Sequence, residues 1–285
     1  MASDRRTGRD ARTTSIWLTD SSTAERTSRR RPPAGGQPAG LDLERIVAAT
    51  VRLLDAEGLA KVSMRRLAAE LGVTAMSVYW YVDTKDELLE LALDSVHAEI
   101  RLPEDEGEGE DEDEGDWRQQ LRQLATEHRR MLVAHPWVSP LAGEYLNVGP
   151  HALAFMNAAQ RAMRRSGLAP EHLMGALSLL FQFTYGFGTV EGRWSERCRA
   201  TGIREDDFYG EVLARLKGRP EYALSVSTVE ARPGGTVREI RDRDFEFALE
   251  CAMAGIAAMR GRPPAKGGES GKSGESGEIG EGAEG

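Results

Sequence analysis

Residues 63–82 read SMRRLAAELGVTAMSVYWYV, a stretch that describes two short helices around a glycine turn. Ser63 is a candidate N-cap for a first helix whose apolar residues recur at three- and four-residue intervals. Gly72 stands where a left-handed residue would end that helix, and Thr74 is a candidate N-cap for a second helix over residues 75–81. So tight a turn predicts a helix-turn-helix, in which the N-terminal end of the second helix enters a major groove.

Helices are also predicted on both sides of this pair. Residues 41–57 place apolar side chains on one helical face, and Gly58 ends the pattern. Thr84 and Glu87 form a potential capping box that opens a longer helix from Lys85 to about Arg101. Residues 41–101 therefore predict an N-terminal three-helix helix-turn-helix DNA-binding domain.

The side chains of the second short helix suit nucleic acid. Val78 is expected to point inward, with small polar groups and long aromatics around it. Small polar and methyl groups suit base edges, whereas phenol and amine donors suit phosphates. Plainer roles stay open, because Arg65 also fits a solvated helix charge and Met76 also fits a packed position. Trp80 and Tyr81 also fit the core of the domain.

The rest of the chain is predicted to be helical as well. Pro136 stops a helix that begins near Asp116, while Pro150 and Pro170 can each start one. These helices are expected over residues 116–135, 150–167, 170–194, 206–217 and 242–260. Since no convincing strand-like alternation appears, the predicted fold class is all-α, with a larger helical domain after the N-terminal one.

Composition sets the expected limits of the folded parts. Residues 1–40 carry eight Arg against four acids and are rich in Ser, Thr, Pro and Gly, so phosphate contacts and a plain solvated leader both fit this arm. Residues 104–116 hold ten carboxylates, whereas the whole chain has a net charge of −9. The net negative charge of the chain therefore comes from this one loop. The predicted parts are a disordered arm (1–40), the DNA-binding domain (41–101), an acidic loop (102–116), the C-terminal domain (117–261) and a disordered tail (262–285).

Several classes of protein are disfavoured by what the sequence lacks. Its two cysteines form no C-x-x-C pair and no cluster with histidine, so we expect neither a metal site nor a cofactor. No run of eighteen apolar residues and no apolar signal core occurs, which predicts a cytoplasmic protein with no membrane partner. The five histidines are scattered, and neither H-E-x-x-H nor G-x-S-x-G is present, so no enzyme is expected.

Three runs occur in order and without gaps: Leu67-Ala-x-x-Leu-Gly-Val73, Ser77-Val-Tyr-Trp-Tyr81 and Lys85-x-Glu-Leu-Leu89. With these runs, residues 41–101 resemble the DNA-binding domain of the TetR (tetracycline-repressor) family of transcriptional regulators. The resemblance implies contacts with bases or nearby backbone from Ser63, Arg65, Thr74, Ala75, Met76, Ser77 and Trp80. It implies phosphate contacts from Tyr79, Tyr81 and Lys85.

Residues 117–260 likewise resemble the C-terminal domain of tetracycline repressors, through Trp117, Arg129-Arg130 and Phe183-Thr-x-Gly186 among others. In that family, two helices of each subunit pack into a four-helix bundle. The resemblance implies a homodimer built from about residues 171–194 and 242–260. The expected interface residues are Leu180, Gly186, Gly188, Leu249, Met253 and Ile256.

The resemblance also implies a site for a small-molecule effector. Aligned without gaps, the positions that bind tetracycline in that family are here Arg101, Leu124 and His128, so a magnesium–tetracycline ligand is not expected. A pocket is expected among Arg101, Leu124, His128, Phe155, Met156, Phe181 and Tyr185, although each of these residues also fits the core.

The implied function is a repressor that binds a palindromic double-stranded DNA operator as a homodimer and is released by the effector. A bound effector is expected to favour a dimer whose two reading helices no longer match a spacing of about 34–36 Å. An activator fits as well, and a helical binding module without sequence-specific DNA binding is the remaining alternative.

Overall fold

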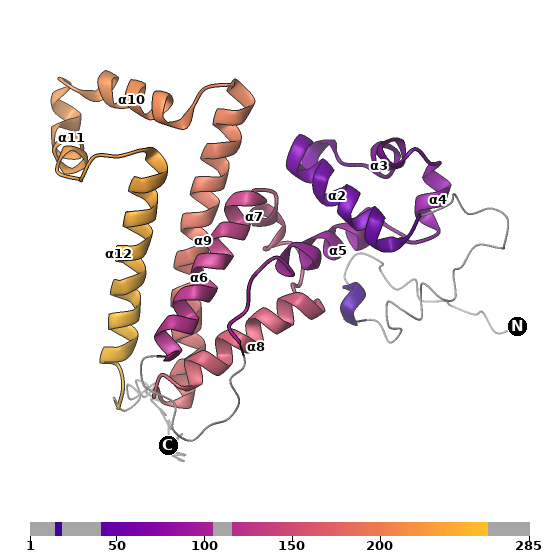
Figure 1. The fold of residues 1–285 in the computed structure, drawn as a ribbon, viewed down its shortest axis with the longest axis horizontal. Helices are drawn as coiled ribbons and strands as arrows, with labels where there is room; N and C mark the ends of the chain where they lie inside the picture. The colour runs from indigo at the N-terminus through magenta and orange to yellow at the C-terminus, as the bar shows by residue number, and fades with distance from the viewer. Residues whose placement is uncertain (1–14, 19–40, 105–115, 262–285) are drawn as a thin grey trace, which may run out of the picture.

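A computed structural model describes residues 15–18, 41–104 and 116–261 (Figure 1). Every regular element within these ranges is helical, which confirms the all-α class. The described residues leave out most of the arm, residues 105–115 of the acidic loop and the tail at 262–285. The expectations for these segments therefore fall outside the described residues. Residues 15–18 correct the arm prediction, because η1 (Ile16–Leu18) is an ordered 3-10 turn.

The head consists of four helices, α2 to α5, and its first three follow the predicted pattern. They are α2 (Leu43–Glu57), α3 (Met64–Leu71) and α4 (Ala75–Tyr79), with the turn η2 (Leu59–Lys61) after α2. Ser63 caps α3 through the Arg66 amide, and Gly72 ends it in a left-handed conformation with φ of 68°. Thr74 caps α4 through the Ser77 amide at 3.2 Å. Each predicted cap is confirmed, although α4 ends two residues before Tyr81.

The fourth helix, α5 (Lys85–His97), leads out of the head and ends before the predicted Arg101. Thr84 accepts a hydrogen bond from the Glu87 amide, as expected for a capping box. The Glu87 carboxylate turns instead to the amide of Asp83 at 2.7 Å, so only half of the box forms. Most of α5 is buried, including charged residues near its end, because it packs against α2 on one side and α8 on the other.

The C-terminal helices form the larger part of the molecule (Figure 1). They begin with α6 (Asp116–Ala134), α7 (Val138–Leu141), α8 (Pro150–Arg164) and α9 (Pro170–Thr201), and α12 (Val237–Ala258) closes the fold. The predicted starts at Pro150 and Pro170 are confirmed. Helix α9 runs past the predicted end at Trp194, and α12 begins earlier than predicted because Thr236 and Glu239 form a complete capping box.

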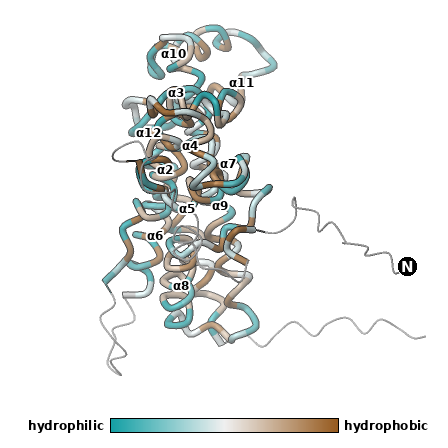
Figure 2. The backbone as a smooth tube through the Cα atoms, turned by 90° about the vertical axis from the view of Figure 1, so that its right-hand side faces the viewer, coloured by the Kyte–Doolittle hydropathy of each residue, from teal (hydrophilic) through white to brown (hydrophobic). Residues whose placement is uncertain are grey.

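An excursion of three short elements connects α9 to α12 and stands at one end of the molecule (Figure 1). It contains α10 (Glu205–Leu216), which confirms the predicted helix, then η3 (Pro220–Tyr222) and α11 (Ala223–Glu230), which were not predicted. No residue of α10 or α11 is buried within the described part of the chain. Figure 2 shows hydrophobic and hydrophilic residues alternating along most helices, as packing on one face requires.

Helix α9 lies directly against α6, and two glycines permit this approach. A Cβ atom at Gly188 would lie 2.7 Å from Leu132 Cβ, and one at Gly192 would lie 2.9 Å from the Leu132 carbonyl oxygen. Real Cβ atoms do not approach other atoms so closely. Both glycines therefore face α6 within the same chain.

An ion cluster, buried at Arg129 and Glu191, joins α12 to this pair of helices. Arg129 of α6 donates to Glu191 of α9 at 2.9 Å and pairs with Asp242 of α12 at the same distance. The Arg129 guanidinium also lies 4.6 Å from the ring centre of Phe245. Buried charges require such partners, so the cluster fixes how three helices meet.

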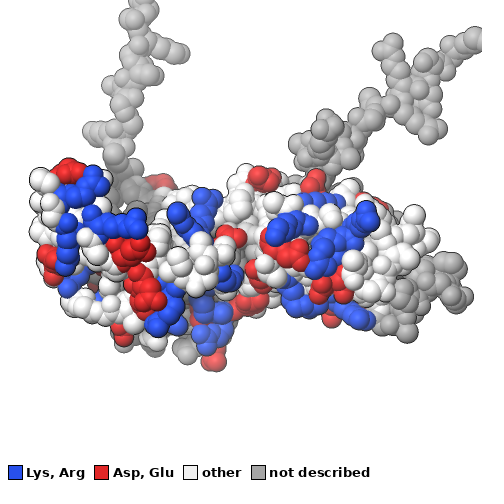
Figure 3. All heavy atoms as spheres, turned by 90° about the horizontal axis from the view of Figure 1, so that it is seen from above, with Lys and Arg blue, Asp and Glu red and all other residues white. Residues whose placement is uncertain are grey.

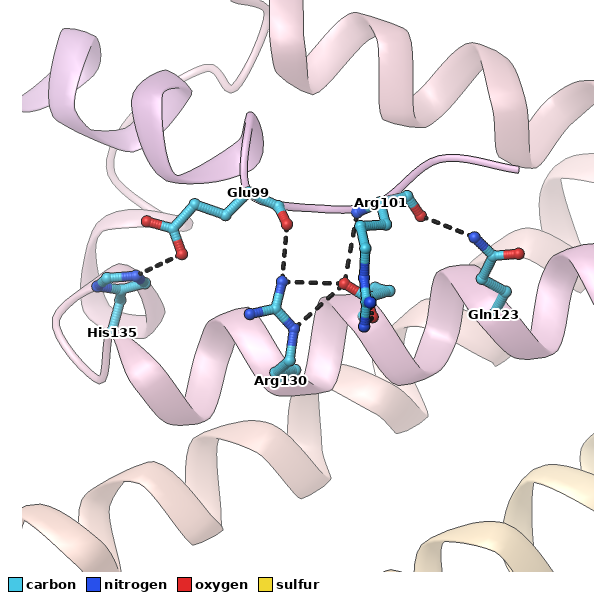
Figure 4. Close-up of polar contacts among 6 residues, drawn as sticks. Glu99, Arg101, Gln123, Arg130 and His135 are labelled. Carbon is cyan, nitrogen blue, oxygen red and sulfur yellow. Dashed lines mark hydrogen bonds and ion pairs between the residues drawn. The ribbon is translucent and has the colours of Figure 1, made fainter. Parts of the chain in front are cut away.

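The end of α5 is fastened to α6 by a network of polar contacts (Figure 4). The buried Glu127 of α6 accepts hydrogen bonds from Arg101 at 2.6 Å and from Arg130 at 2.9 Å. Arg130 also donates to the Glu99 carbonyl at 2.7 Å, and Gln123 donates to the Arg101 carbonyl at 3.1 Å. The backbone that leaves the head is thereby held along α6.

His135, just after α6, joins this region to the head. Its Nδ1 lies 2.7 Å from Asp55 of α2, and its Nε2 lies 3.1 Å from Glu99 (Figure 4). Trp137 donates to the same Asp55 oxygen at 2.7 Å. Burial disfavours the charged imidazole, but the two carboxylates outweigh burial and raise the pKa of His135 above its ordinary value of 6.5.

Replacement of His135 by Asn should therefore destabilise the protein in a pH-dependent way. A raised pKa means that folding favours the protonated imidazole, so the stabilisation is complete below an ordinary pKa of about 6.5 and is lost as the pH rises through the folded-state value. Urea unfolding between about pH 5.5 and 8.5 measures the free energy of unfolding. His151→Asn controls for loss of an exposed histidine. A wild-type-to-variant difference that did not change with pH would contradict this assignment.

Candidate functional site

The predicted DNA-contacting residues divide into an exposed and a half-buried set. The exposed set is Ser63, Arg65, Thr74, Met76, Tyr79 and Trp80; the half-buried set is Ala75, Ser77, Tyr81 and Lys85. Met76 is 67% exposed and Trp80 is 45% exposed. Such large side chains on a five-residue helix and at its C-cap form a surface that is suited to contact a partner.

One residue accounts for the way α4 presents its side chains. Val78 is fully buried, and Val82 joins it in the core of the head. Because α4 is anchored through Val78, the residues around it face outward, as the sequence predicts. The turn at Gly72 and the cap at Thr74 fix where this helix begins.

Small polar groups lie at the beginning of α4. The hydroxyl groups of Thr74 and Ser77 are 2.9 Å apart, and the Thr74 oxygen also accepts the Ser77 amide hydrogen. These hydroxyls can bond base edges or phosphate oxygens after a rotation about one side-chain bond. Their cap also keeps the short helix formed.

Two neighbouring arginines on α3 differ in their freedom. Arg66 is held by Glu57 at 2.6 Å and by Glu70 at 3.1 Å. Arg65 is exposed, and it forms no ion pair with any residue that the structure describes. Arg65 is therefore the α3 cation that is available to a phosphate or a base.

Tyr81 has a partner inside the head. Its hydroxyl donates a hydrogen bond to the Leu41 carbonyl at 2.6 Å, which ties the start of α2 to the end of the reading pair. This hydrogen bond fits the alternative that the sequence left open for Tyr81, a place in the core of the domain. The other predicted phosphate-contacting tyrosine, Tyr79, is exposed, and its hydroxyl bonds no residue that the structure describes.

The charges of the head do not form one basic field on the face that Figure 3 displays. Figure 3 shows Lys and Arg interspersed with Asp and Glu over the face that it displays. Binding of nucleic acid would then depend on a few placed contacts rather than on a large positive surface.

A second group of predicted residues meets where four helices converge. His128 of α6 lies 5.3 Å from Phe155 of α8 and 5.8 Å from Phe181 of α9, measured between ring centres. The two phenylalanine rings are themselves 5.1 Å apart. Leu124 is fully buried, and Tyr185 is half-buried with its hydroxyl on the Ser139 carbonyl at 2.6 Å. We call His97, His128, Phe155 and Phe181 the aromatic cluster.

His128 is the exceptional member of the aromatic cluster. Its Nδ1 atom is buried and has no hydrogen-bond partner among the described residues. Burial, with a smaller effect of the neighbouring His97, lowers the pKa of His128 to about 3, so the imidazole is neutral at pH 7. A neutral imidazole can give one hydrogen bond and accept another.

His97 was not predicted as a site residue, yet it links α5 to the aromatic cluster. Its ring lies 6.4 Å from Phe155, its Nδ1 is 2.8 Å from the Leu93 carbonyl, and its Nε2 is 2.9 Å from the Asn147 amide. Burial lowers the pKa of His97. Its position in the last turn of an apolar helix was the only available signal, and that signal does not say which helices will surround it.

Two predicted pocket residues are misplaced. The Arg101 side chain is 77% exposed and is bound to the buried Glu127 of α6. Met156 is also exposed, on the outer face of α8. Neither belongs to the aromatic cluster, because α5 ends earlier than predicted and Met156 directly follows the inward-facing Phe155.

The predicted dimer residues also need correction. Leu180, Leu249, Met253 and Ile256 are buried in the core of a single chain, and Gly188 faces α6. Only Gly186 is exposed. The large apolar side chains exposed on the same two helices, or at the C-cap of α12, are Met174, Leu179, Val190, Phe247 and Met259. Two of them, Leu179 and Met259, line an apolar groove of about 290 Å³ together with Leu168.

Comparison with known proteins matches both halves of the chain to one family. Residues 46–92 match the model for bacterial regulatory proteins of the tetR family, and residues 109–260 match the tetracyclin repressor-like C-terminal domain. An HTH-type transcriptional regulator of Saccharopolyspora erythraea is 35% identical over 78% of this chain and 86% of its own. The HTH-type transcriptional repressor DrrR1 of Streptomyces coeruleorubidus is 34% identical over 81% and 82%.

The solved structures agree with this match. The TetR family protein ActR of Streptomyces coelicolor, in complex with actinorhodin, is 31% identical to this chain and covers 79% of it with 99% of its own length, at a TM-score of 0.62. Two family models, relatives matched over more than four fifths of their own length and a shared fold thus agree with the helix-turn-helix geometry. The chain belongs to the TetR family of helix-turn-helix transcriptional regulators.

Proposed function

We propose that this regulator is a cytoplasmic, non-enzymatic repressor that binds a palindromic operator as a homodimer and is released by a small-molecule effector. The observation that carries the proposal is the outward face of α4, where Met76, Tyr79 and Trp80 are exposed around the buried Val78. Bases are contacted from Ser63, Arg65, Thr74, Ala75, Met76, Ser77 and Trp80. Phosphates are contacted from Tyr79 and Lys85, while the Tyr81 hydroxyl stays on Leu41.

Selection of bound duplexes from a random DNA library by the purified protein tests this proposal. A homodimer should enrich an inverted repeat whose half-sites lie about one helical turn apart. An activator would enrich the same kind of site, and a reporter placed downstream of it would separate the two functions. Enrichment of no sequence at moderate salt would overturn operator binding and favour a helical binding module.

Tyr79→Ala and Lys85→Ala should each weaken binding to the selected duplex by about tenfold, because each loses a phosphate contact in both heads. The loss should be similar on all sequences, and Lys85→Ala should also reduce the salt dependence. Fluorescence anisotropy titrations at several salt concentrations measure both effects. Tyr222→Ala and Lys217→Ala are matched controls on the distant excursion. Equal losses in the controls would contradict the assignment.

The homodimer is proposed to form through the exposed faces of α9 and α12. Helix α9 is long and apolar enough to span a membrane by length and composition, and only 22% of its most apolar window is buried within one chain. A second copy would cover this excess of apolar surface, including Leu179, Val190 and Phe247. This proposal replaces the buried residues that the sequence had suggested.

Phe247→Glu should therefore convert the dimer to a monomer without unfolding it, because the side chain is 74% exposed in the single chain. A charge there would be buried without a partner in the dimer. Analytical ultracentrifugation gives the mass, and circular dichroism checks the helix content. Leu153→Glu places the same charge on the exposed face of α8 as a control. A Phe247→Glu protein that remained dimeric would refute this interface.

The effector is proposed to bind at the aromatic cluster. Phe155 and Phe181 can stack on an aromatic ring, and His128 can bond a polar group. These contacts suit a flat aromatic molecule with a hydroxyl or carbonyl group. ActR, bound to actinorhodin in its solved structure, supports a site for a large ligand in this fold. Because His97 connects the cluster to α5, a ligand there could displace the helix that carries the head.

His128→Leu should raise the free energy of unfolding by about 1–2 kcal/mol, because it removes a buried nitrogen that lacks a partner. Binding-site residues are commonly retained at such a cost in stability. Urea unfolding near pH 7 provides the measurement, with His172→Leu, a half-buried histidine outside the cluster, as the control. A clear destabilisation by His128→Leu would indicate that His128 serves packing alone.

A further inference from the structure

Residues 15–18, within the predicted N-terminal arm, lie against α5, whose Glu90 is 74 or more residues away in sequence (Figure 1). Ser15 and Ile16 are buried, and Trp17 packs partly on the core, whereas Leu18 is 59% exposed. The amide of Leu18 bonds the Ser15 carbonyl at 3.1 Å, and the amide of Trp17 bonds the Ser15 hydroxyl at 3.3 Å. The turn is therefore internally bonded, with a buried side and an exposed side.

The turn binds one carboxylate of α5. Glu90 is buried, and its Oε2 accepts the hydroxyl hydrogen of Ser15 and the amide of Ile16, the latter at 3.3 Å. Burial raises the pKa of Glu90, and the two hydrogen bonds oppose that shift. A buried carboxylate requires such donors, and residues 15 and 16 supply both.

Glu90 stands in the middle of a row of acids that join α5 to the C-terminal helices. Asp86, Glu90 and Asp94 are four residues apart and so share one helical face. Asp86 accepts the Tyr145 hydroxyl at 2.9 Å, and Asp94 accepts the amides of His151 and Ala152, each at 3.0 Å. We call this contact between α5 and residues 145–152 the seam. Ser15 and Ile16 bond Glu90, the middle one of these three acids.

We propose that residues 15–18 are a docking segment that fastens the arginine-rich arm to α5 and braces the seam between the head and the C-terminal helices. The site on α5 takes a named occupant, the Ser-Ile-Trp-Leu turn of the same chain. Because Glu90 lies between Asp86 and Asp94, a rotation of α5 against residues 145–152 would change the surroundings of Glu90 and of its two bonds to the turn. Docking and the orientation of the head are therefore thermodynamically linked.

Hydrogen exchange of the full-length protein tests the docking. The amides of residues 16–18 should exchange about tenfold or more slowly than in Ile16→Asp, which places a charge at the buried position. Leu18→Asp places the same charge on the exposed side of the turn and should keep the protection. Exchange of residues 16–18 in the wild type at the rate of Ile16→Asp would overturn docking.

The same experiment tests the brace. In Ile16→Asp, the amides of His151 and Ala152 should exchange severalfold faster than in the wild type and in Leu18→Asp, because the seam has lost its middle contact. The amides of α12 lie away from the seam and should not change. Protected residues 16–18 in the wild type combined with unchanged seam amides in Ile16→Asp would overturn the brace. Neither result depends on an operator or an effector.

Discussion

Helix α5 has to satisfy two packing partners at once, and the rest of the structure depends on this constraint. Its apolar residues complete the core of the head, and its acidic face meets the C-terminal helices. Each buried charge on that face therefore needs a donor from outside the head. Asp94 reaches the start of α8 so closely that a Cβ at Gly149 would lie 2.3 Å from its carboxyl group. Any other residue at position 149 would force the Asp94 side chain or the start of α8 to move.

This constraint explains how a ligand site could influence a DNA-binding surface. The aromatic cluster draws one residue from each of four helices, and the residue from α5 is His97. The network of Glu127 with Arg101 and Arg130 fixes the chain just after α5 to α6 (Figure 4). His135 adds a contact from the end of α6 to α2. A change in the cluster thus has short, packed routes to the head, each made of named contacts.

The sequence predicted best those features that depend on neighbouring residues. Ser63, Gly72 and Thr74 act within one turn of the chain, so their roles as caps could be read directly. Which face of a long helix turns outward depends on distant partners, and here the prediction failed: Gly186 is exposed, whereas Gly188, two residues later, packs on α6. The docking of residues 15–18 was missed for the same reason, because its partner Glu90 lies 74 or more residues away.

The central claim is that the head and the C-terminal helices form one cooperative unit joined through α5. Hydrogen exchange in rising urea measures this most directly, by following amides of α3 and α4 together with amides of α9. The account predicts that both groups lose protection at the same urea concentration. Loss of protection in the head at a clearly lower concentration, with α9 still protected, would show that the two parts unfold independently and would contradict it.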